Sequence, residues 1–245
     1  TIVGDARGDE NVGADGTTIS NCVSTAAAFS SNYQAGGIAG WTNLGVFENN
    51  VAYGAVTAPG GGAAGICSMI DNSGHASFKG NVSAIPYAKG GNNRTSGILG
   101  WKNGSGCAID GDDPNLSSEA TQYFVGGNLT PAADIKFDEN NDGIDGTVTC
   151  VTDLKTAATY TNVGFSTDFW NLVDGQYPTL KTQAAIENAI YTAQAPSRYV
   201  VGTEYDTQAA SALGSTVTIT SSNPSVVAVE GTTLKFEAQG DAVVT

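Results

Sequence analysis

The stretch Ala35-Gly36-Gly37-Ile38-Ala39-Gly40-Trp41 decides the fold, because versions of it return twice along the chain. The second version is Ala63-Ala64-Gly65-Ile66-Cys67-Ser68-Met69, and the third is Thr95-Ser96-Gly97-Ile98-Leu99-Gly100-Trp101. All three contain a Gly-Ile pair followed by a small or apolar residue. The pair recurs after 28 residues, from Gly37 to Gly65, and after 32 residues, from Gly65 to Gly97. Such a spacing is typical of a solenoid, a propeller or another repeat array.

A second pattern keeps nearly the same period. Residues 19–23, 47–51 and 78–82 each begin with an apolar residue, continue with polar residues and end with valine. Their first residues are separated by 28 and 31 positions, from Ile19 to Phe47 and from Phe47 to Phe78. Two patterns that advance together indicate a true repeat rather than a chance of composition.

The repeat predicts strands and turns rather than helices. Each copy holds short apolar runs separated by Gly, Asn, Ser and Thr, without a helical stripe of useful length. In a β-helix each coil pairs its strands with the coils above and below, so equivalent residues stack. We expect one inward ladder of Ile38, Ile66 and Ile98, and a second of Trp41, Met69 and Trp101.

The residues Gly-Gly-Ile-Ala-Gly-Trp at 36–41, followed by Phe-Glu-Asn-Asn-Val-Ala-Tyr-Gly-Ala-Val at 47–56, resemble the GLUG repeat of bacterial surface and secreted proteins. The resemblance covers residues 1–180. It implies a right-handed parallel β-helix on an extracellular protein, and it implies no reaction.

Composition narrows the choice of partners. The formal net charge is −14, which argues against nucleic acid and against anionic lipid, because both bind through Lys and Arg. No apolar run approaches the ~18–20 residues that cross a bilayer, so no membrane insertion is expected.

The first residues, Thr1-Ile2-Val3-Gly4, look like the tail of another repeat copy. We therefore expect a mature or excised piece of a longer protein at the cell surface, with its export signal and anchor elsewhere.

The four cysteines, Cys22, Cys67, Cys107 and Cys150, lack the Cys-x-x-Cys spacing of a zinc site. Cys67 occupies the position of Ala39 and Leu99, which predicts a small buried apolar side chain. Cys107 and Cys150 flank the least regular region and are candidates for a disulfide, although four cysteines allow three full pairings. The single histidine, His75, is interpreted as a residue of a surface loop.

Two loops are candidates for binding a glycan or a host-cell or other cell-surface protein, because loops on one side of a solenoid often form its binding face. The predicted binding residues are Asn92, Asn93, Arg94, Asp110, Asp112 and Asp113. The three aspartates are also the candidates for a polysaccharide-cleaving site, which would need two or three carboxylates on one face.

A calcium site is one interpretation of residues 138–143. Asp138, Asn140 and Asp142 place oxygen atoms at alternate positions before Gly143, as in the first half of a calcium loop. The twelfth position is Thr149 instead of Glu, so an acidic turn without metal is the alternative. The sequence contains no motif that requires a cofactor, and calcium is the one candidate.

The end of the chain changes character. Residues 147–151 alternate like a strand, and the aromatic segment 164–180 is expected to cover an open end of the solenoid. Residues 181–196 are predicted to be a linker or short helix that ends at Pro196. Within residues 197–245, Ile219-Thr-Ser-Ser-Asn-Pro-Ser-Val-Val-Ala-Val229 and Leu234-Lys-Phe-Glu-Ala238 resemble the bacterial Ig-like group 2 domain. This resemblance implies a small, short or partial β-sandwich that serves as a spacer.

The sequence thus predicts an all-β protein with a β-solenoid at 1–180, a linker at 181–196 and an Ig-like module at 197–245. Motifs of zinc proteases, serine hydrolases and phosphate-binding loops are absent from the sequence. We expect a non-catalytic extracellular surface protein that acts as a structural or adhesive stalk, with end-to-end self-association into filaments as a variant. The alternatives are a glycan- or protein-binding adhesin module and a polysaccharide lyase or hydrolase.

Overall fold

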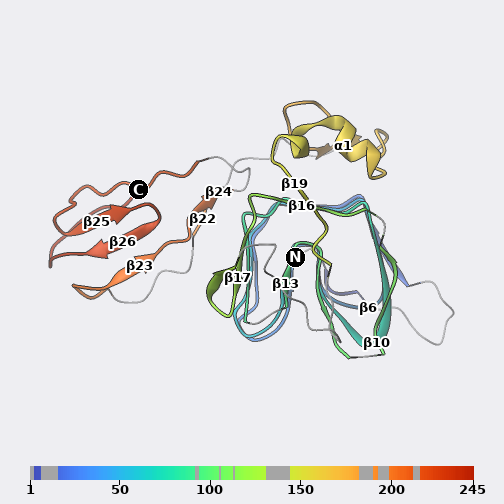
Figure 1. The fold of residues 1–245 in the computed structure, drawn as a ribbon, viewed down its shortest axis with the longest axis horizontal. Helices are drawn as coiled ribbons and strands as arrows, with labels where there is room; N and C mark the ends of the chain where they lie inside the picture. The colour runs from blue at the N-terminus through green and yellow to red at the C-terminus, as the bar shows by residue number, and fades with distance from the viewer. Residues whose placement is uncertain are drawn as a thin grey trace. The chain divides into compact units, whose positions relative to one another are not determined.

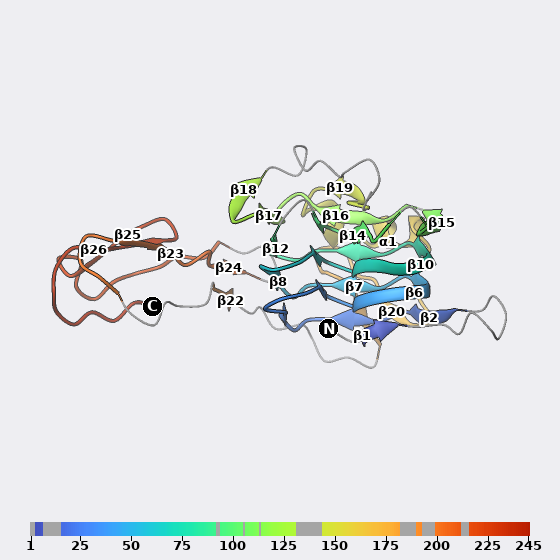
Figure 2. The same ribbon diagram turned by 90° about the horizontal axis from the view of Figure 1, so that it is seen from below.

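The computed structural model describes residues 3–6, 16–91, 94–104, 106–112, 114–130, 144–181, 190–192, 199–211 and 216–245. The chain divides into two compact units, Thr1–Glu187 and Asn188–Thr245. The first unit is a β-solenoid of about four coils whose strands pair in parallel from coil to coil. Figure 1 looks along the stack, so the coils overlap, and Figure 2 shows them one above another.

Each coil has four sides, which we call A to D in the order in which the chain visits them. Side A is formed by β1 (Val3–Ala6), β2 (Thr17–Ser20), β6 (Ala39–Glu48), β10 (Cys67–Lys79), β14 (Leu99–Lys102) and β15 (Ala108–Asp112). Side B is formed by β3 (Val23–Ser24), β7 (Val51–Ala52), β11 (Val82–Ser83), β16 (Leu116–Ser118) and β19 (Thr147–Thr149). Side C is formed by β4 (Ala28–Phe29), β8 (Val56–Ala58), β12 (Tyr87–Gly90), β17 (Gln122–Val125) and the antiparallel β18 (Asn128–Thr130). Side D is formed by β5 (Ala35–Gly36), β9 (Ala63–Ala64) and β13 (Thr95–Ser96).

The register confirms the two repeat patterns. Cys67 pairs with Ala39 on one side and with Leu99 on the other, and Ile19, Phe47 and Phe78 lie in one column. The rings of Phe47 and Phe78 stack with centroids 5.0 Å apart. Ile38, Ile66 and Ile98 are fully buried in the same core cluster, so their inward ladder is confirmed.

The predicted second ladder is in register but does not belong to that core. Met69 pairs with Trp41 and with Trp101, as expected from the repeat. Trp41 is half-buried, however, and Met69 and Trp101 are buried outside the central cluster. The prediction that this ladder points into the core was therefore wrong. The alternation of inward and outward side chains that is expected of a flat strand is not kept where the chain turns from side D into side A.

The glycine of each Gly-Ile pair is needed for close stacking. A Cβ at Gly37 would overlap the carbonyl oxygen of Gly65, and a Cβ at Gly65 would overlap that of Gly97. Only glycine leaves enough space for the next coil at this corner. The repeat signature thus follows from the distance between coils.

Buried asparagines connect the coils between sides A and B. Asn50, Asn81 and Asn115 occupy equivalent positions and are almost completely buried. The Asn81 amide nitrogen donates to the carbonyl oxygen of Phe47 (2.8 Å) and to Oδ1 of Asn115 (3.0 Å), and Oδ1 of Asn81 accepts from the Asn50 side chain (3.0 Å). In the first coil Cys22 takes this position, and its backbone N–H donates to Oδ1 of Asn50 (3.0 Å). We call this column the asparagine ladder.

Residues 150–181 pack along the outside of side B, where Figure 1 shows α1 (Ala157–Asn162) beside β16 and β19. Tyr160, Phe165 and Trp170 form a buried cluster with residues such as Val51 and Val82 of side B. We expected this aromatic segment to cover an end of the solenoid, and that prediction was wrong. Apolar valines point outward along side B and need a cover, so the segment runs across several coils as a lateral buttress.

The contacts of the buttress reach back to the first coil. Trp170 Nε1 donates to Oδ1 of Asn21 (2.9 Å), and the Tyr53 hydroxyl donates to the carbonyl oxygen of Pro178 (3.1 Å). The buttress also contains the 3₁₀ turn Asp153–Lys155 and the short antiparallel pair of β20 (Trp170–Asn171) and β21 (Thr179–Leu180). Among the described residues no helix is long and apolar enough to cross a bilayer.

The second unit is small and antiparallel. Its main sheet has the order β23 (Glu204–Asp206), β26 (Thr233–Phe236), β25 (Val227–Glu230), and β22 (Ile190–Tyr191) pairs with β24 (Ala210–Ser211). Ile190 had been placed in a helix or linker, but it lies in β22. Residues 216–220 belong to no strand, and an isolated bridge joins Ser221 to Val244.

All four cysteines are free, so the candidate disulfide between Cys107 and Cys150 is not formed. Cys67 is fully buried in the core, as its place in the repeat predicted.

Candidate functional site

The described part of the chain contains only some of the predicted site residues. Asn92, Asn93 and Asp113 lie outside the described residues, as do the proposed calcium ligands Asp138, Asn140 and Asp142. The remaining candidates are Arg94, Asp110 and Asp112, and each is placed by a different element of the solenoid.

Arg94 lies at the corner that leads into side D and stacks on an aromatic ring. Its guanidinium carbon lies 3.3 Å from the centre of the Trp101 ring, which is the geometry of a cation–π contact. Trp101 is 5% exposed, and its indole nitrogen has no hydrogen-bond partner. Trp41 and Met69 occupy the position of Trp101 in the two preceding coils. Arg94 therefore lies beside a short column of two tryptophans and one methionine.

Asp110 contacts His75 of the neighbouring coil through a polar side-chain contact. Nδ1 of His75 lies 2.9 Å from Oδ1 of Asp110, and the two side chains are 50% and 55% exposed. Ile109 pairs with Ala76 and Gly111 with Ser77, so Asp110 is the extra residue of a bulge. His75 lies in β10 and not in a loop, which corrects the interpretation from the sequence. A second polar contact nearby joins Nδ2 of Asn103 to Oδ1 of Asp71 (2.6 Å).

Of the predicted carboxylate cluster, the structure describes the side chain of Asp110 alone. Asp112 lies in the backbone position that pairs with Phe78, two residues beyond the Asp110 bulge. Among the described residues no three His, Cys, Asp or Glu side chains come close enough to hold a metal ion. Arg94 precedes β13 and contacts β14, whereas Asp110 lies in β15 on the other half of side A, so the two do not share one site.

The sequence did not predict a set of polar side chains inside the solenoid. Ser83 and Ser117 pair with each other on side B, and their hydroxyls are buried without a hydrogen-bond partner. Asp145 accepts a hydrogen bond from the backbone N–H of Gly97 (2.8 Å), and burial raises the pKa of its carboxyl. Burial and the nearby Asp145 carboxylate raise the pKa of Tyr123 well above its ordinary value. The buried hydroxyls of Ser83, Ser117 and Tyr123 are not available for recognition of a partner.

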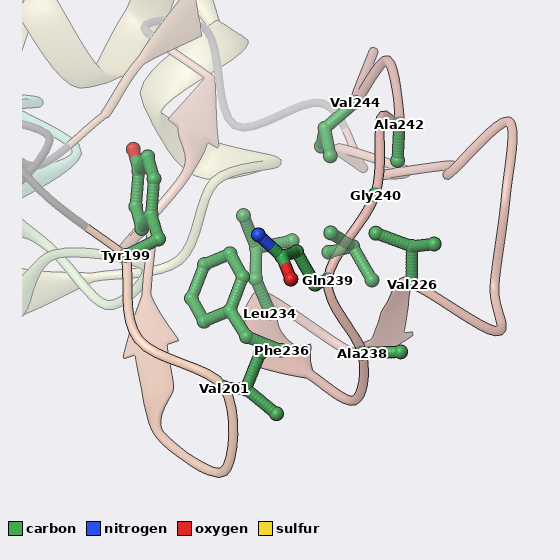
Figure 3. Close-up of a pocket in the computed structure, with 11 residues that line it drawn as sticks. Tyr199, Val201, Val226, Leu234, Phe236, Ala238, Gln239, Gly240, Ala242 and Val244 are labelled. Carbon is green, nitrogen blue, oxygen red and sulfur yellow. The ribbon is translucent and has the colours of Figure 1, made fainter.

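The C-terminal unit contains an apolar cleft of about 420 Å³, which the sequence did not predict. Figure 3 shows the side chains that line it, with Gln239 among apolar neighbours. The rings of Tyr199 and Phe236 lie 4.6 Å apart. Leu234 is almost fully buried, whereas Tyr199 and Val201 are exposed by 50% and 54%. The cleft is therefore an open, uncharged surface bounded by the sheet and by the last residues of the chain.

Comparison with known proteins supports only the fold. No family model matches the chain, and no curated protein matches it. A solved structure from Bacteroides ovatus, named "putative immunoglobulin A1 protease", matches with a TM-score of 0.53 at 17% sequence identity. The match covers 74% of this chain and 62% of that one. At this identity the likeness concerns the architecture alone.

Proposed function

We propose that the chain is a non-catalytic extracellular surface module, in which the solenoid acts as a stiff structural or adhesive stalk. The observation that carries this proposal is the combination of continuous parallel ladders on four sides with a buried asparagine ladder. Such a stack resists bending because each coil is hydrogen-bonded to its neighbours along its circumference.

The resemblance to GLUG repeats supports a bacterial surface location and a right-handed coil. The resemblance of residues 219–238 to Ig-like group 2 domains supports a spacer role for the C-terminal unit. Self-association end to end into filaments is the variant in which the stalk is extended by further copies. Calcium binding at 138–142 belongs to the same proposal as an optional stabiliser.

The location is tested with antibodies raised against the solenoid. Intact cells of the source bacterium should label as strongly as lysed cells. Labelling that requires lysis would overturn the surface assignment. Electron microscopy of the purified chain at increasing concentration tests the filament variant, and only single particles at every concentration would exclude it.

An adhesive role has one specific observation in its favour, which is the arginine stacked on Trp101. Aromatic rings and guanidinium groups are common in surfaces that bind glycans or proteins. A glycan array and a panel of host-cell proteins test this role, with Arg94→Ala as the variant expected to abolish any signal. A signal unchanged in that variant would remove this corner as the binding site.

A protease is the competing function, because the similar Bacteroides ovatus structure carries that name. The described residues offer the contact between His75 and Asp110 but no cluster that could hold a metal ion. Incubation of purified chain with immunoglobulin A1 should leave the heavy chain intact. Cleavage that disappears in His75→Ala would overturn the non-catalytic proposal. A polysaccharide lyase or hydrolase is tested in the same way with acidic polysaccharides and the variant Asp112→Ala.

A further inference from the structure

Three hydroxyl groups are enclosed inside the solenoid without a hydrogen-bond partner among the described residues. They belong to Ser83, Ser117 and Tyr123, whose side chains are at most 1% exposed. A buried hydroxyl that bonds to nothing destabilises the fold, and most buried polar groups of native proteins are satisfied by the chain or by ordered water. The surroundings of these hydroxyls therefore indicate which group satisfies them.

The register places the two serines one above the other. Ser83 of the third coil pairs with Ala52 of the second coil and with Ser117 of the fourth. Ala52 belongs to the central core, so the serines that continue its column face the interior of the solenoid. Tyr123 reaches the same interior from side C, where it continues the core column of Ala88.

The hydroxyls converge on the glycines of two Gly-Ile pairs. A Cβ at Gly65 would overlap the hydroxyl oxygen of Ser83 and the carbonyl oxygen of Gly97. A Cβ at Gly97 would lie 2.8 Å from Cβ of Ser117 and 3.2 Å from the hydroxyl oxygen of Tyr123. The three hydroxyls therefore surround one small region between the third and fourth coils.

A carboxylate lies beside this region. Oδ1 of Asp145 accepts a hydrogen bond from the backbone N–H of Gly97 (2.8 Å). Burial raises the pKa of Tyr123, the Asp145 carboxylate raises it further, and the hydroxyls of Ser117 and Thr121 lower it. These groups are thus close enough to act on the Tyr123 hydroxyl, but none of them meets the geometry of a direct hydrogen bond with it. Polar groups at such separations are commonly joined by a water molecule.

The spacing of the coils suits a bridging water. Neighbouring strands are separated by about 4.8 Å, whereas an O–H···O hydrogen bond is about 2.7 Å long. The hydroxyls of Ser83 and Ser117 do not bond to each other, but one water oxygen between the two coils can reach both. Ala52 has no hydroxyl, so this arrangement begins at the third coil.

Water suits these groups better than a cation does. Each hydroxyl has a proton to donate, and a cation cannot accept it. A water molecule accepts and donates hydrogen bonds, and a buried water typically makes about three of them to otherwise unsatisfied polar groups. The number of hydroxyls that meet here is therefore what a single water requires.

We propose that a water molecule is bound inside the solenoid between the third and fourth coils, where it bridges the hydroxyls of Ser83, Ser117 and Tyr123. The Asp145 carboxylate, which lies beside Tyr123, is a further acceptor. The water joins the two coils from the interior and is released when they separate. This inference goes beyond the stalk role and does not depend on it.

Oxygen-17 relaxation dispersion of the full chain in solution counts the water molecules that remain bound inside it. The parent chain should show one more such water than the double variant Ser83→Ala/Ser117→Ala, which repeats the alanine of the second coil. Ser68→Ala is the matched control, because the buried Ser68 hydroxyl already donates to the carbonyl oxygen of Gly62 (2.8 Å). This control should leave the count unchanged.

Removal of a single hydroxyl tests the contact through the sign of its effect. Tyr123→Phe should lower the urea midpoint, because it removes a hydrogen bond to the bound water. If the hydroxyl were unsatisfied, its removal would raise the midpoint instead. Tyr53→Phe removes a hydroxyl that bonds directly to the carbonyl oxygen of Pro178 (3.1 Å), so it should lower the midpoint in either case.

A high-resolution crystal structure of the parent chain tests the proposal without any variant. It should show an oxygen atom about 2.7–3.0 Å from each of the three hydroxyls. Absence of density there, an equal water count in the parent chain and the double variant, or a raised midpoint in Tyr123→Phe would overturn the proposal. An anomalous peak at this position in crystals soaked with thallium would assign the site to a cation and would overturn it as well.

Discussion

At the scale of single residues, the asparagine ladder determines how the coils are held in register. Each amide uses its oxygen and its nitrogen within the stack, so donors and acceptors of neighbouring coils are satisfied together. A buried polar group without such partners is costly, and a column that is fully satisfied favours one register over slipped ones.

Removing one asparagine of the ladder should therefore lower the free energy of unfolding substantially. Asn81→Ala leaves the Phe47 carbonyl oxygen and the Asn50 backbone N–H without these partners. We expect a loss of about 2–4 kcal/mol in the free energy of unfolding, since each orphaned buried group costs roughly 1–3 kcal/mol. Urea denaturation measures it. Asn103→Ala, which removes an exposed contact to Asp71, is the control and should stay within about 0.5 kcal/mol. Equal effects of the two variants would contradict the importance of the ladder.

Asp145 predicts a specific dependence of stability on pH. Burial raises the pKa of its carboxyl above the ordinary value of 3.8, so the folded chain holds this proton more tightly than the unfolded chain. The contribution of Asp145 is therefore fully present below pH 3.8 and is lost as the pH rises through the raised pKa. Asp145→Asn keeps an acceptor for Gly97 and should flatten the stability curve over this range. Urea midpoints at several pH values measure it, and identical curves for the two proteins would contradict the assignment.

The sequence revealed the positions of these residues better than their roles. The columns of Ile38 and Phe47 follow directly from the period, because stacking in a solenoid places equivalents together. Asn50 was visible only as one of the polar residues between Phe47 and Val51. Its side-chain amide belongs to the asparagine ladder because of the backbone geometry at the corner between sides A and B, which the repeat spacing alone does not reveal. Asp145 lies beyond the regular repeats, and no local pattern marked it as buried.

At the scale of elements, the buttress explains why side B is buried on both faces. Ala52 belongs to the central core, and Val51 belongs to the cluster that contains Trp170. A strand whose successive residues are all buried must be covered on both sides. This pattern at Val51 and Ala52 was a signal, available from the sequence, that a side of the solenoid would be covered.

The buttress should detach from side B when its largest buried side chain, Trp170, is truncated. Trp170 is 1% exposed and bonds to Asn21, so Trp170→Ala should cost about 3–5 kcal/mol. The neighbouring Phe169 is 54% exposed, and Phe169→Ala is the control. Limited proteolysis should cut within residues 150–181 of the first variant well before the solenoid. Resistance equal to that of the parent chain would show that the buttress does not depend on this anchor.

Element boundaries were hardest to predict where the chain leaves the repeat. Helix α1 has only six residues and carries one fully buried side chain, Tyr160, so it shows no helical stripe. Its place is set by packing on side B rather than by helix propensity. Residues 216–220 alternate between exposed and half-buried side chains as a strand does, but they belong to no strand.

At the scale of the whole molecule, the two units have separate apolar cores. Among the described residues, both large clusters consist of residues before 181, and the buried apolar residues of the second unit are Val227 and Leu234. Units with separate cores are expected to open independently.

A substitution in one core should therefore leave the other unit protected. Leu234→Ala should increase hydrogen exchange throughout β23, β25 and β26 by tenfold or more, since loss of such a side chain costs about 2–5 kcal/mol. Exchange in β6 and β10 should be unchanged. Ile66→Ala should give the reverse pattern. An increase in both units from either substitution would show that they unfold as one.

Side A accommodates coils of different length. Relative to the second coil, the third contains three additional residues between Ile70 and His75, and the fourth contains a further residue there and the Asp110 bulge. Despite these additions Val51, Val82 and Leu116 remain aligned on side B. The scaffold therefore tolerates changes in length within side A while the adjacent side B keeps its register. Foreign epitopes spliced in between Thr42 and Leu44, between Ile70 and His75, and between Lys102 and Ala108 would be displayed in a row along one edge, about 4.8 Å apart per coil.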